Sequence, residues 1–169
     1  MSGSTEEADV SWREDSLPVS KHFDDVYFSA EGGLAEARHV FLAGNDLPTR
    51  WQNSNSFSIA ELGFGTGLNF LATWELWRKT KPRDGRLQYV SFEKYPLSRE
   101  SIDKSLSLFP ELDKFRSELL RYLPLALNGF HRIPLESSDV NLTLVYGDAR
   151  KALPRFRGSI DAWFFDGFA

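Results

Sequence analysis

The chain has 169 residues, of which 41% are hydrophobic and 26% charged, so it fits one globular domain and excludes disorder throughout. It contains no Cys, which excludes disulfides, thiolate metal sites and cysteine nucleophiles. His22, His39 and His131 lie far apart in the sequence, so we expect no histidine metal site. With a net charge of -4, the chain can bind nucleic acid only through a local basic patch.

No apolar run is long enough for a membrane helix, and the acidic N-terminus does not resemble a signal peptide. We therefore expect a cytoplasmic protein. Residues 1–20 are polar and show no periodicity, which predicts a mobile leader followed by a domain over 21–169.

Within that domain, strand and helix patterns alternate along the chain. Such alternation is typical of βαβ units, so we predict an α/β fold with a parallel sheet covered on both faces. The predicted helices lie at 33–44, at 68–77, from Ser98 onward, within 109–124 and at 149–156. The predicted strands lie at 57–62, at 87–93, as a pair around a turn within 131–148, and within 159–169.

Four acidic residues, Glu61, Glu93, Asp148 and Asp166, follow or end strands, where α/β sheets bind their ligands. Glu61 opens a glycine-rich turn in which Gly63, Gly65 and Gly67 let the backbone approach a ligand and aim helix N–H groups at it. A dinucleotide fingerprint would need Gly at position 68, where this chain has Leu68. The spacing therefore favours S-adenosylmethionine over NAD.

The other strand ends complete a predicted nucleoside pocket. Glu93 is suited to accept hydrogen bonds from both ribose hydroxyls. Asp148 can accept one from an adenine amino group, while the backbone N–H of Ala149 donates to a ring nitrogen. For any one of these acids alone, a solvated carboxylate at a strand end is the simpler interpretation. The placement of all of them at strand ends favours the nucleoside pocket.

Asp166 is the candidate for chemistry, because its strand is expected beside the first one, facing the methyl donor. A carboxylate there can orient an amine and accept its proton as a general base. Phe168 could stack on a planar base. The simpler alternative is a turn carboxylate followed by a core Phe.

Two basic segments differ in their expected positions. The connector from Arg78 to Arg86 precedes the second strand and is interpreted as a solvated loop opposite the site. Arg150 and Lys151 follow the third strand, so they are better placed for contact with phosphate.

Several motifs together resemble the methyltransferase domain of the bacterial MnmC family, which modifies the tRNA wobble uridine. The glycine motif by itself indicates only a methyltransferase, whereas its combination with the C-terminal motif is specific to this family. The matching segments are DDVYFS (24–29), GLAEARHVFL (33–42), ELGFGTGLNFL (61–71), FEKYPL (92–97), FPEL (109–112), GFHR (129–132), YGDA (146–149) and DAWFFDGFA (161–169).

The resemblance implies a Rossmann-like class I methyltransferase that uses S-adenosylmethionine to N-methylate 5-aminomethyl-(2-thio)uridine at the tRNA wobble position. Asp166 matches the proposed catalytic acid, and Tyr27 and Ser29 match a segment that lies over the site in such enzymes. The positions that match the cofactor pocket are Phe64, Gly65, Asn69, Glu93, Lys94 and Asp148.

The chain also departs from the family pattern. The family continues beyond the Asp-Gly-Phe-Ala segment, so we expect a sheet that is truncated after its fourth strand. We also expect residues 162–165 to form an exposed apolar edge that promotes self-association. We find no segment suited to bind FAD, so we expect the FAD-oxidase domain of the bifunctional enzyme to be absent from this chain. Two alternatives stay open, a module that binds S-adenosylmethionine without turnover and a nicotinamide-dependent oxidoreductase.

Overall fold

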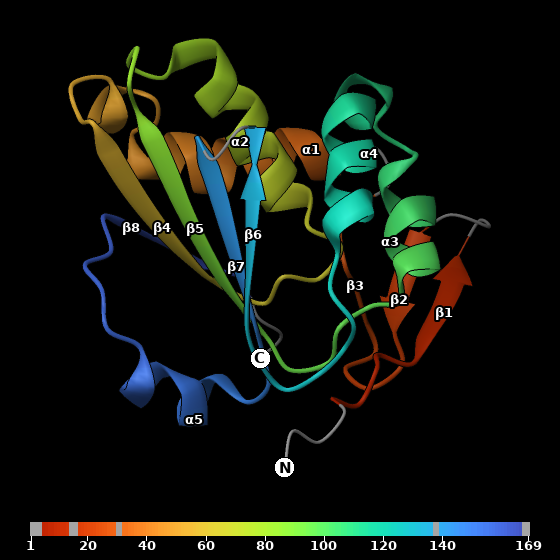
Figure 1. Ribbon diagram of the computed structural model, residues 1–169. Coiled ribbons are helices and arrows are strands. Elements are labelled where there is room, and N and C mark those ends of the chain that lie inside the picture. Colours follow the sequence, from red (N-terminus) through yellow and green to blue (C-terminus); the bar gives the residue numbers. More distant parts are fainter. Residues whose placement is uncertain (1–4, 14–16, 30–31, 137–138, 167–169) are drawn as a thin grey trace.

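The computed structural model describes residues 5–13, 17–29, 32–136 and 139–166, and Figure 1 shows how their elements are arranged. A five-stranded sheet forms the centre, and a small three-stranded sheet from the N-terminal part of the chain lies to one side. In this part of the chain, no helix is long and apolar enough to cross a membrane.

The central sheet confirms the predicted α/β fold but is mixed. The strands β4 (Ser56–Leu62), β5 (Arg86–Glu93), β7 (Val140–Tyr146) and β8 (Ala162–Phe165) are parallel. The strand β6 (Gly129–Leu135) pairs with β7 in the antiparallel sense, which gives the order β6-β7-β5-β4-β8. The expectation of an all-parallel sheet is thus corrected, because the short connection between β6 and β7 can join only antiparallel strands.

Four helices and the main hydrophobic core lie on one face of this sheet. They are α1 (Gly33–Glu36), α2 (Leu68–Thr80), α3 (Arg99–Leu106) and α4 (Asp113–Tyr122), and α1 continues as a π-helical segment to Leu42. The core contains large aromatic side chains that are completely buried; on this face they include Trp51, Trp74, Trp77, Tyr89, Phe70 and Phe164.

The opposite face has a much smaller apolar cluster of Val90, Phe92 and Val145. The short helix α5 (Ala149–Ala152) and the turn after it cover this cluster, with Phe156 in edge contact with Phe92. Both faces are therefore covered, as the sequence predicts, but unequally.

Local sequence signals account for several element boundaries. The side chain of Ser98 accepts a hydrogen bond from the backbone N–H of Ser101, which starts α3 where the sequence predicts it. Pro134 lies in β6, and proline is tolerated there because β6 is an edge strand that needs hydrogen bonds on one side only.

The N-terminal segment is the part of the fold that differs most from the sequence-based prediction. Instead of a mobile leader over 1–20, its described residues form the strands β1 (Val10–Arg13) and β2 (Leu17–Ser20). Together with β3 (Asp25–Val26) they make the small antiparallel sheet. The strands are short, and distant partners hold the segment, including the carbonyl of Pro96, which accepts from Ala8 N–H at 3.0 Å. Such non-local hydrogen bonds leave no periodic signal in the sequence.

The strand β8 lies at an edge of the central sheet, beside β4. Its side chains differ in burial, because Phe164 is completely buried whereas Phe165 is 71% exposed. Phe165 stacks on Trp163, with ring centroids 5.8 Å apart. The predicted self-association of this edge stays a prediction.

Candidate active site

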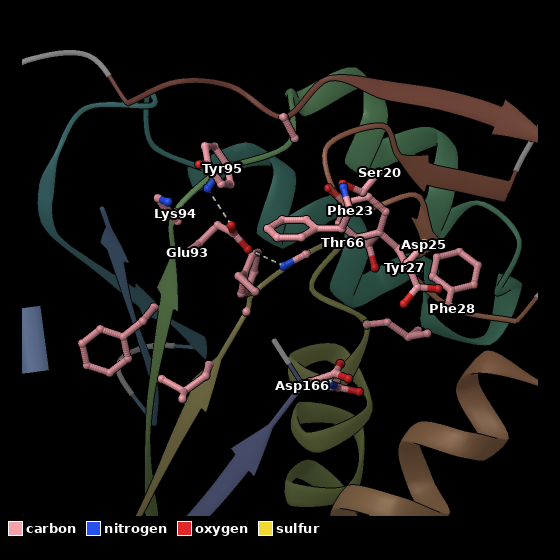
Figure 2. Close-up of a pocket in the computed structure, with 18 of the residues that line it drawn as sticks. Ser20, Phe23, Asp25, Tyr27, Phe28, Thr66, Glu93, Lys94, Tyr95 and Asp166 are labelled. Carbon is pink, nitrogen blue, oxygen red and sulfur yellow. Dashed lines mark hydrogen bonds between the residues drawn. The ribbon is translucent and has the colours of Figure 1, made fainter. Parts of the chain in front are cut away.

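A cavity of about 890 Å³ opens at the carboxyl ends of the parallel strands. The loops after β4, β5, β7 and β8 form one side of it, and residues 20–29 of the N-terminal part form the other. Figure 2 shows Tyr27 and Phe23 of that N-terminal segment across the cavity from Glu93. This is where an open α/β sheet binds its ligand, and the volume suits a ligand of nucleoside size.

The glycine-rich turn after β4 brings bare backbone to the cavity. Gly63, Gly65 and Gly67 all have positive φ angles, which side chains rarely adopt. A Cβ at Gly65 would lie 3.1 Å from the ring of Tyr27, so a side chain at this position would crowd that ring. Gly67 is the N-cap of α2 and lacks a side-chain cap, which leaves the first N–H groups of that helix available.

Glu93 ends β5 and lines the cavity. Its carboxylate accepts hydrogen bonds from the backbone N–H groups of Gly65 at 2.9 Å and Tyr95 at 2.8 Å, as Figure 2 shows. Burial raises the pKa of Glu93 above its usual value, while these backbone donors lower it. The backbone thus fixes an acceptor at the position that the sequence assigns to the ribose hydroxyls.

Asp148 follows β7 and is the N-cap of α5, where it accepts from the backbone N–H of Arg150 at 2.9 Å. The Arg150 guanidinium also contacts the carboxylate, at 2.8 Å. Hydrogen bonds from Arg150 lower the pKa of Asp148 to about 2, so this group is ionised at neutral pH. Asp148 and Ala149 both line the cavity, and Arg150 already occupies part of the acceptor capacity of Asp148.

Asp166 lies at the end of β8 and lines the same cavity. Asn69, in the first turn of α2, donates to Asp166 Oδ2 at 2.7 Å and to Glu61 Oε1 at 3.1 Å. One amide group therefore connects two carboxyl groups that are 105 residues apart in sequence. The connection could not be read from the sequence, which placed Asn69 only by family resemblance.

The two connected carboxyl groups differ in environment. Glu61 is completely buried behind the cavity, where Ser91 Oγ donates to it at 2.7 Å. Burial raises the pKa of Glu61 to about 8, although the donors Ser91 and Asn69 act in the opposite direction. Burial also raises the pKa of Asp166, the Asn69 hydrogen bond lowers it, and the charge of Glu36 raises it further. Asp166 is thus a carboxylate with raised basicity that faces the cavity.

The cavity brings most of the predicted site residues together. Glu61 and Gly67 support the site from behind without lining it, and Phe168 lies outside the described residues. The predicted residues that line the cavity are Gly63, Phe64, Gly65, Asn69, Glu93, Lys94, Asp148, Ala149, Asp166, Tyr27 and Ser29.

Sequence reasoning missed an aromatic group at the cavity wall. His22 contacts Phe23 and Tyr95, with ring centroids 4.6 Å and 4.9 Å apart. Lys94 Nζ lies 4.7 Å from the centroid of the Tyr95 ring. The FEKYPL motif contains Tyr95, but no sequence signal indicated that residues 22 and 23 would face it.

The charges at the cavity are mostly negative. Among the described residues that line it, the Lys or Arg side chain is Lys94. The lining acids are Glu6, Glu7, Asp9, Asp25, Glu36, Glu93, Asp148 and Asp166. Such a cavity attracts a cationic ligand, such as a sulfonium or an ammonium group, and repels phosphate.

These features define a class of protein. The sheet, the glycine-rich turn and the acid at the end of β5 are those of a Rossmann-like S-adenosylmethionine-dependent methyltransferase. A family model described as S-adenosyl-L-methionine-dependent methyltransferase matches residues 110–169. The fold is similar to that of the crystal structure of MnmC2 from Aquifex aeolicus, with a TM-score of 0.66 and 22% identity. The similarity covers 97% of this chain and 50% of that one.

Within this class, the chain is similar to part of the MnmC proteins. It is 48% identical, over 98% of its length, to the tRNA 5-methylaminomethyl-2-thiouridine biosynthesis bifunctional protein MnmC of Pseudomonas savastanoi pv. phaseolicola. It is 50% identical, over 95% of its length, to the protein of the same name from Leptospira borgpetersenii. The chain spans about a quarter of the length of these curated relatives, 26% and 25% respectively.

Proposed function

We propose that this chain transfers a methyl group from S-adenosylmethionine to the amine of 5-aminomethyl-(2-thio)uridine at the tRNA wobble position. The observation that carries the proposal is the Asn69-held carboxylate of Asp166 in a cavity shared with Glu93 and the glycine-rich turn. The names of the MnmC relatives, which are about half identical to this chain, support tRNA as the substrate.

The residues present fit S-adenosylmethionine. Gly63 and Gly65 line the cavity with positive φ and no side chain, so a ligand can approach the backbone closely there. Glu93, fixed by backbone N–H groups, would accept from the ribose hydroxyls, and Asp148 with Ala149 would contact the adenine. Bound there, S-adenosylmethionine supplies a methyl group on a positively charged sulfur.

Asp166 would prepare the amine for attack. The aminomethyl group is an ammonium in water, and a carboxylate with raised pKa can accept one of its protons as a general base. The lone pair that this transfer frees on nitrogen would then accept the methyl group, and the cofactor would leave as the neutral thioether. The proton removed from nitrogen would pass to Asp166 and from there to water.

Asn69 would hold Asp166 in the orientation that this step needs. Its hydrogen bond to Oδ2 leaves Oδ1 of Asp166 for the amine. Glu61 behind it has a raised pKa of about 8, so it is mainly neutral at pH 7 and adds little repulsion to the charge on Asp166.

Two measurements test the proposal. Calorimetric titration with S-adenosylhomocysteine, with NAD as the paired control, is expected to show binding of the former only. Transfer of tritium from labelled S-adenosylmethionine to tRNA that lacks the wobble methyl group is expected to follow.

The outcomes separate the alternatives. Binding of S-adenosylhomocysteine without tritium transfer would indicate a binding module. Binding of NAD in its place would favour an oxidoreductase. Transfer to tRNA whose wobble uridine lacks the aminomethyl group would contradict the proposed acceptor.

A further inference from the structure

The segment after β7 carries an unbalanced run of positive charge. Between Asp148 and Asp161 the sequence has no acidic residue. The charged residues in this interval are Arg150, Lys151, Arg155 and Arg157, and all four are exposed. The run includes α5 and the turn after it, so these side chains are presented by ordered backbone.

The cations of this run are largely available for an external partner. Of the side chains that the structure describes, none forms an ion pair or a hydrogen bond with Lys151 or Arg155. Arg150 pairs with Asp148 but its side chain is 85% exposed. Arg157 donates to the carbonyls of Pro154 and Phe156, which orients its guanidinium without neutralising it.

The other basic segment is a useful contrast. The connector before β5 lies at the opposite end of the sheet, and its cations are mostly paired. Arg78 contacts Glu136, and Lys81 contacts Asp139 at 2.8 Å. Lys79 contacts Glu75 at 2.6 Å. These cations stabilise the fold locally and leave little net charge for a partner.

The run borders the cavity. Asp148 and Ala149, at its start, line the cavity, and Lys94 is close enough to lower the pKa of Asp148. The exposed ring of Phe165, stacked on Trp163, lines the same rim. Exposed cations and an exposed aromatic side chain around one cavity are features of surfaces that bind single-stranded nucleic acid.

The charge has the opposite sign on the other side of the cavity. Glu6, Glu7, Asp9 and Asp25 line that side, and all four are exposed. Figure 1 shows α5 and the β1–β3 sheet on opposite sides of the strand ends. Phosphate is therefore repelled on the side of the N-terminal sheet and attracted on the side of α5.

We infer that Lys94, Arg150, Lys151, Arg155 and Arg157, here called the basic strip, bind the phosphate backbone of the RNA next to the modified nucleotide. The inference rests on the proposed function, which supplies an RNA substrate. The backbone lies along the strip, so the nucleotide that is modified enters the acidic cavity from the α5 side. The strip positions the substrate and takes no part in the chemistry.

The test reverses two charges that lie outside the cofactor site. The variant Lys151→Glu/Arg155→Glu is compared with Arg83→Glu/Arg86→Glu, which makes the same charge change at exposed positions in the turn before β5 and at its first residue. Binding of transcribed tRNA is measured by fluorescence anisotropy at several salt concentrations. Titration with S-adenosylhomocysteine checks that each variant keeps its fold and cofactor site.

We expect the strip variant to bind tRNA at least about tenfold more weakly at low salt. The slope of the logarithm of its tRNA-binding constant against the logarithm of the salt concentration should become less steep. The decrease should be ~0.7 to 0.9 for each RNA phosphate that the strip no longer neutralises. The control variant should bind tRNA like the unaltered chain. Both variants should bind S-adenosylhomocysteine equally well.

Equal tRNA affinities for the two variants would overturn the inference, as would a failure of the unaltered chain to bind tRNA. Binding of both variants to vesicles of anionic phospholipid is measured as well. If the strip variant loses vesicle binding but keeps tRNA binding, the inference is also overturned. If tRNA is methylated with equal KM by both variants, the strip is refuted while the proposed function stands. If the strip variant loses tRNA binding but no methyl transfer is found, the proposed function fails and the strip stands.

Discussion

The two ends of the cavity hold their carboxylates in different ways. Glu93 accepts from the backbone N–H groups of Gly65 and Tyr95, so the turn itself fixes it. Asp166 accepts from the side chain of Asn69, which also contacts the buried Glu61. Backbone donors persist through most side-chain changes, whereas one substitution removes a side-chain donor. The hydrogen bonds to Glu93 at the proposed binding end should therefore survive most substitutions. The hydrogen bond to Asp166 at the proposed reactive end can be removed by changing one side chain.

The largest effect is expected from Asp166→Asn, which keeps the shape but removes the base. The methyl-transfer rate should fall by roughly 10²- to 10⁴-fold, since this is the usual contribution of a general base. The affinity for S-adenosylhomocysteine should change little. Single-turnover tritium transfer measures the first quantity and calorimetry the second, with Asp84→Asn, an exposed loop position, as the control. A rate unchanged in this variant would remove Asp166 from the mechanism.

The change Glu93→Gln tests the other end. It replaces a charged acceptor by a neutral one, and hydrogen bonds to charged groups contribute about 1.5 to 3 kcal/mol. The affinity for S-adenosylhomocysteine should therefore fall roughly 10- to 100-fold, since each 1.4 kcal/mol is about a factor of ten. Calorimetry with Glu100→Gln as the surface control measures it, and an unchanged Kd would contradict the ribose role.

Removing the connecting amide by Asn69→Ala should shift the pH profile. The Asn69 hydrogen bond lowers the pKa of Asp166, so its loss raises that pKa further. The rate falls as pH drops through the pKa of Asp166, because the base becomes protonated. The acidic limb of the pH–rate profile should therefore move to higher pH in Asn69→Ala. If the rate falls but the acidic limb of the pH–rate profile stays at the same pH, Asn69 has only a structural role.

The smallest effect on the rate is expected from Glu61→Gln, whose main effect is on stability. The pKa of Glu61 is about 8 in the folded chain and near 4.5 when unfolded, so folding favours its protonated form. This contribution is fully present below about pH 4.5 and is lost as pH rises toward 8. Glutamine does not ionise, so Glu61→Gln removes this loss. The free energy of unfolding of the variant minus that of the unaltered chain should therefore be more positive at pH 8 than at pH 5. Urea unfolding at both pH values measures this, and an equal difference at both would contradict the raised pKa.

Local sequence patterns predicted much of the fold. The alternating strand at 57–62, the three glycines and the helix after them appear as β4, the turn and α2. Ser98 starts α3 because an N-cap acts within its own helix, so the signal is local. The strands of the N-terminal sheet were missed because the contacts that hold them, such as Ala8 with Pro96, join distant segments.

The site shows the same division. The acids at the strand ends could be found because parallel strands bring their carboxyl ends to one edge. The amide between Glu61 and Asp166 could not, because it depends on how α2 packs beside β8. The ring of Tyr27 against Gly65 and the contact of His22 with Tyr95 depend in the same way on the docking of residues 20–29.

The sequence by itself determined the order of strands and helices, the glycine-rich turn and the set of acids at the strand ends. Each of these follows from residue properties and from neighbours along the chain. The tertiary structure decided the Asn69 connection between Glu61 and Asp166, and it brought acidic side chains of the N-terminal segment and of the strand ends to one cavity. These depend on hydrogen bonds, burial and charge between residues that are brought together only when the chain folds.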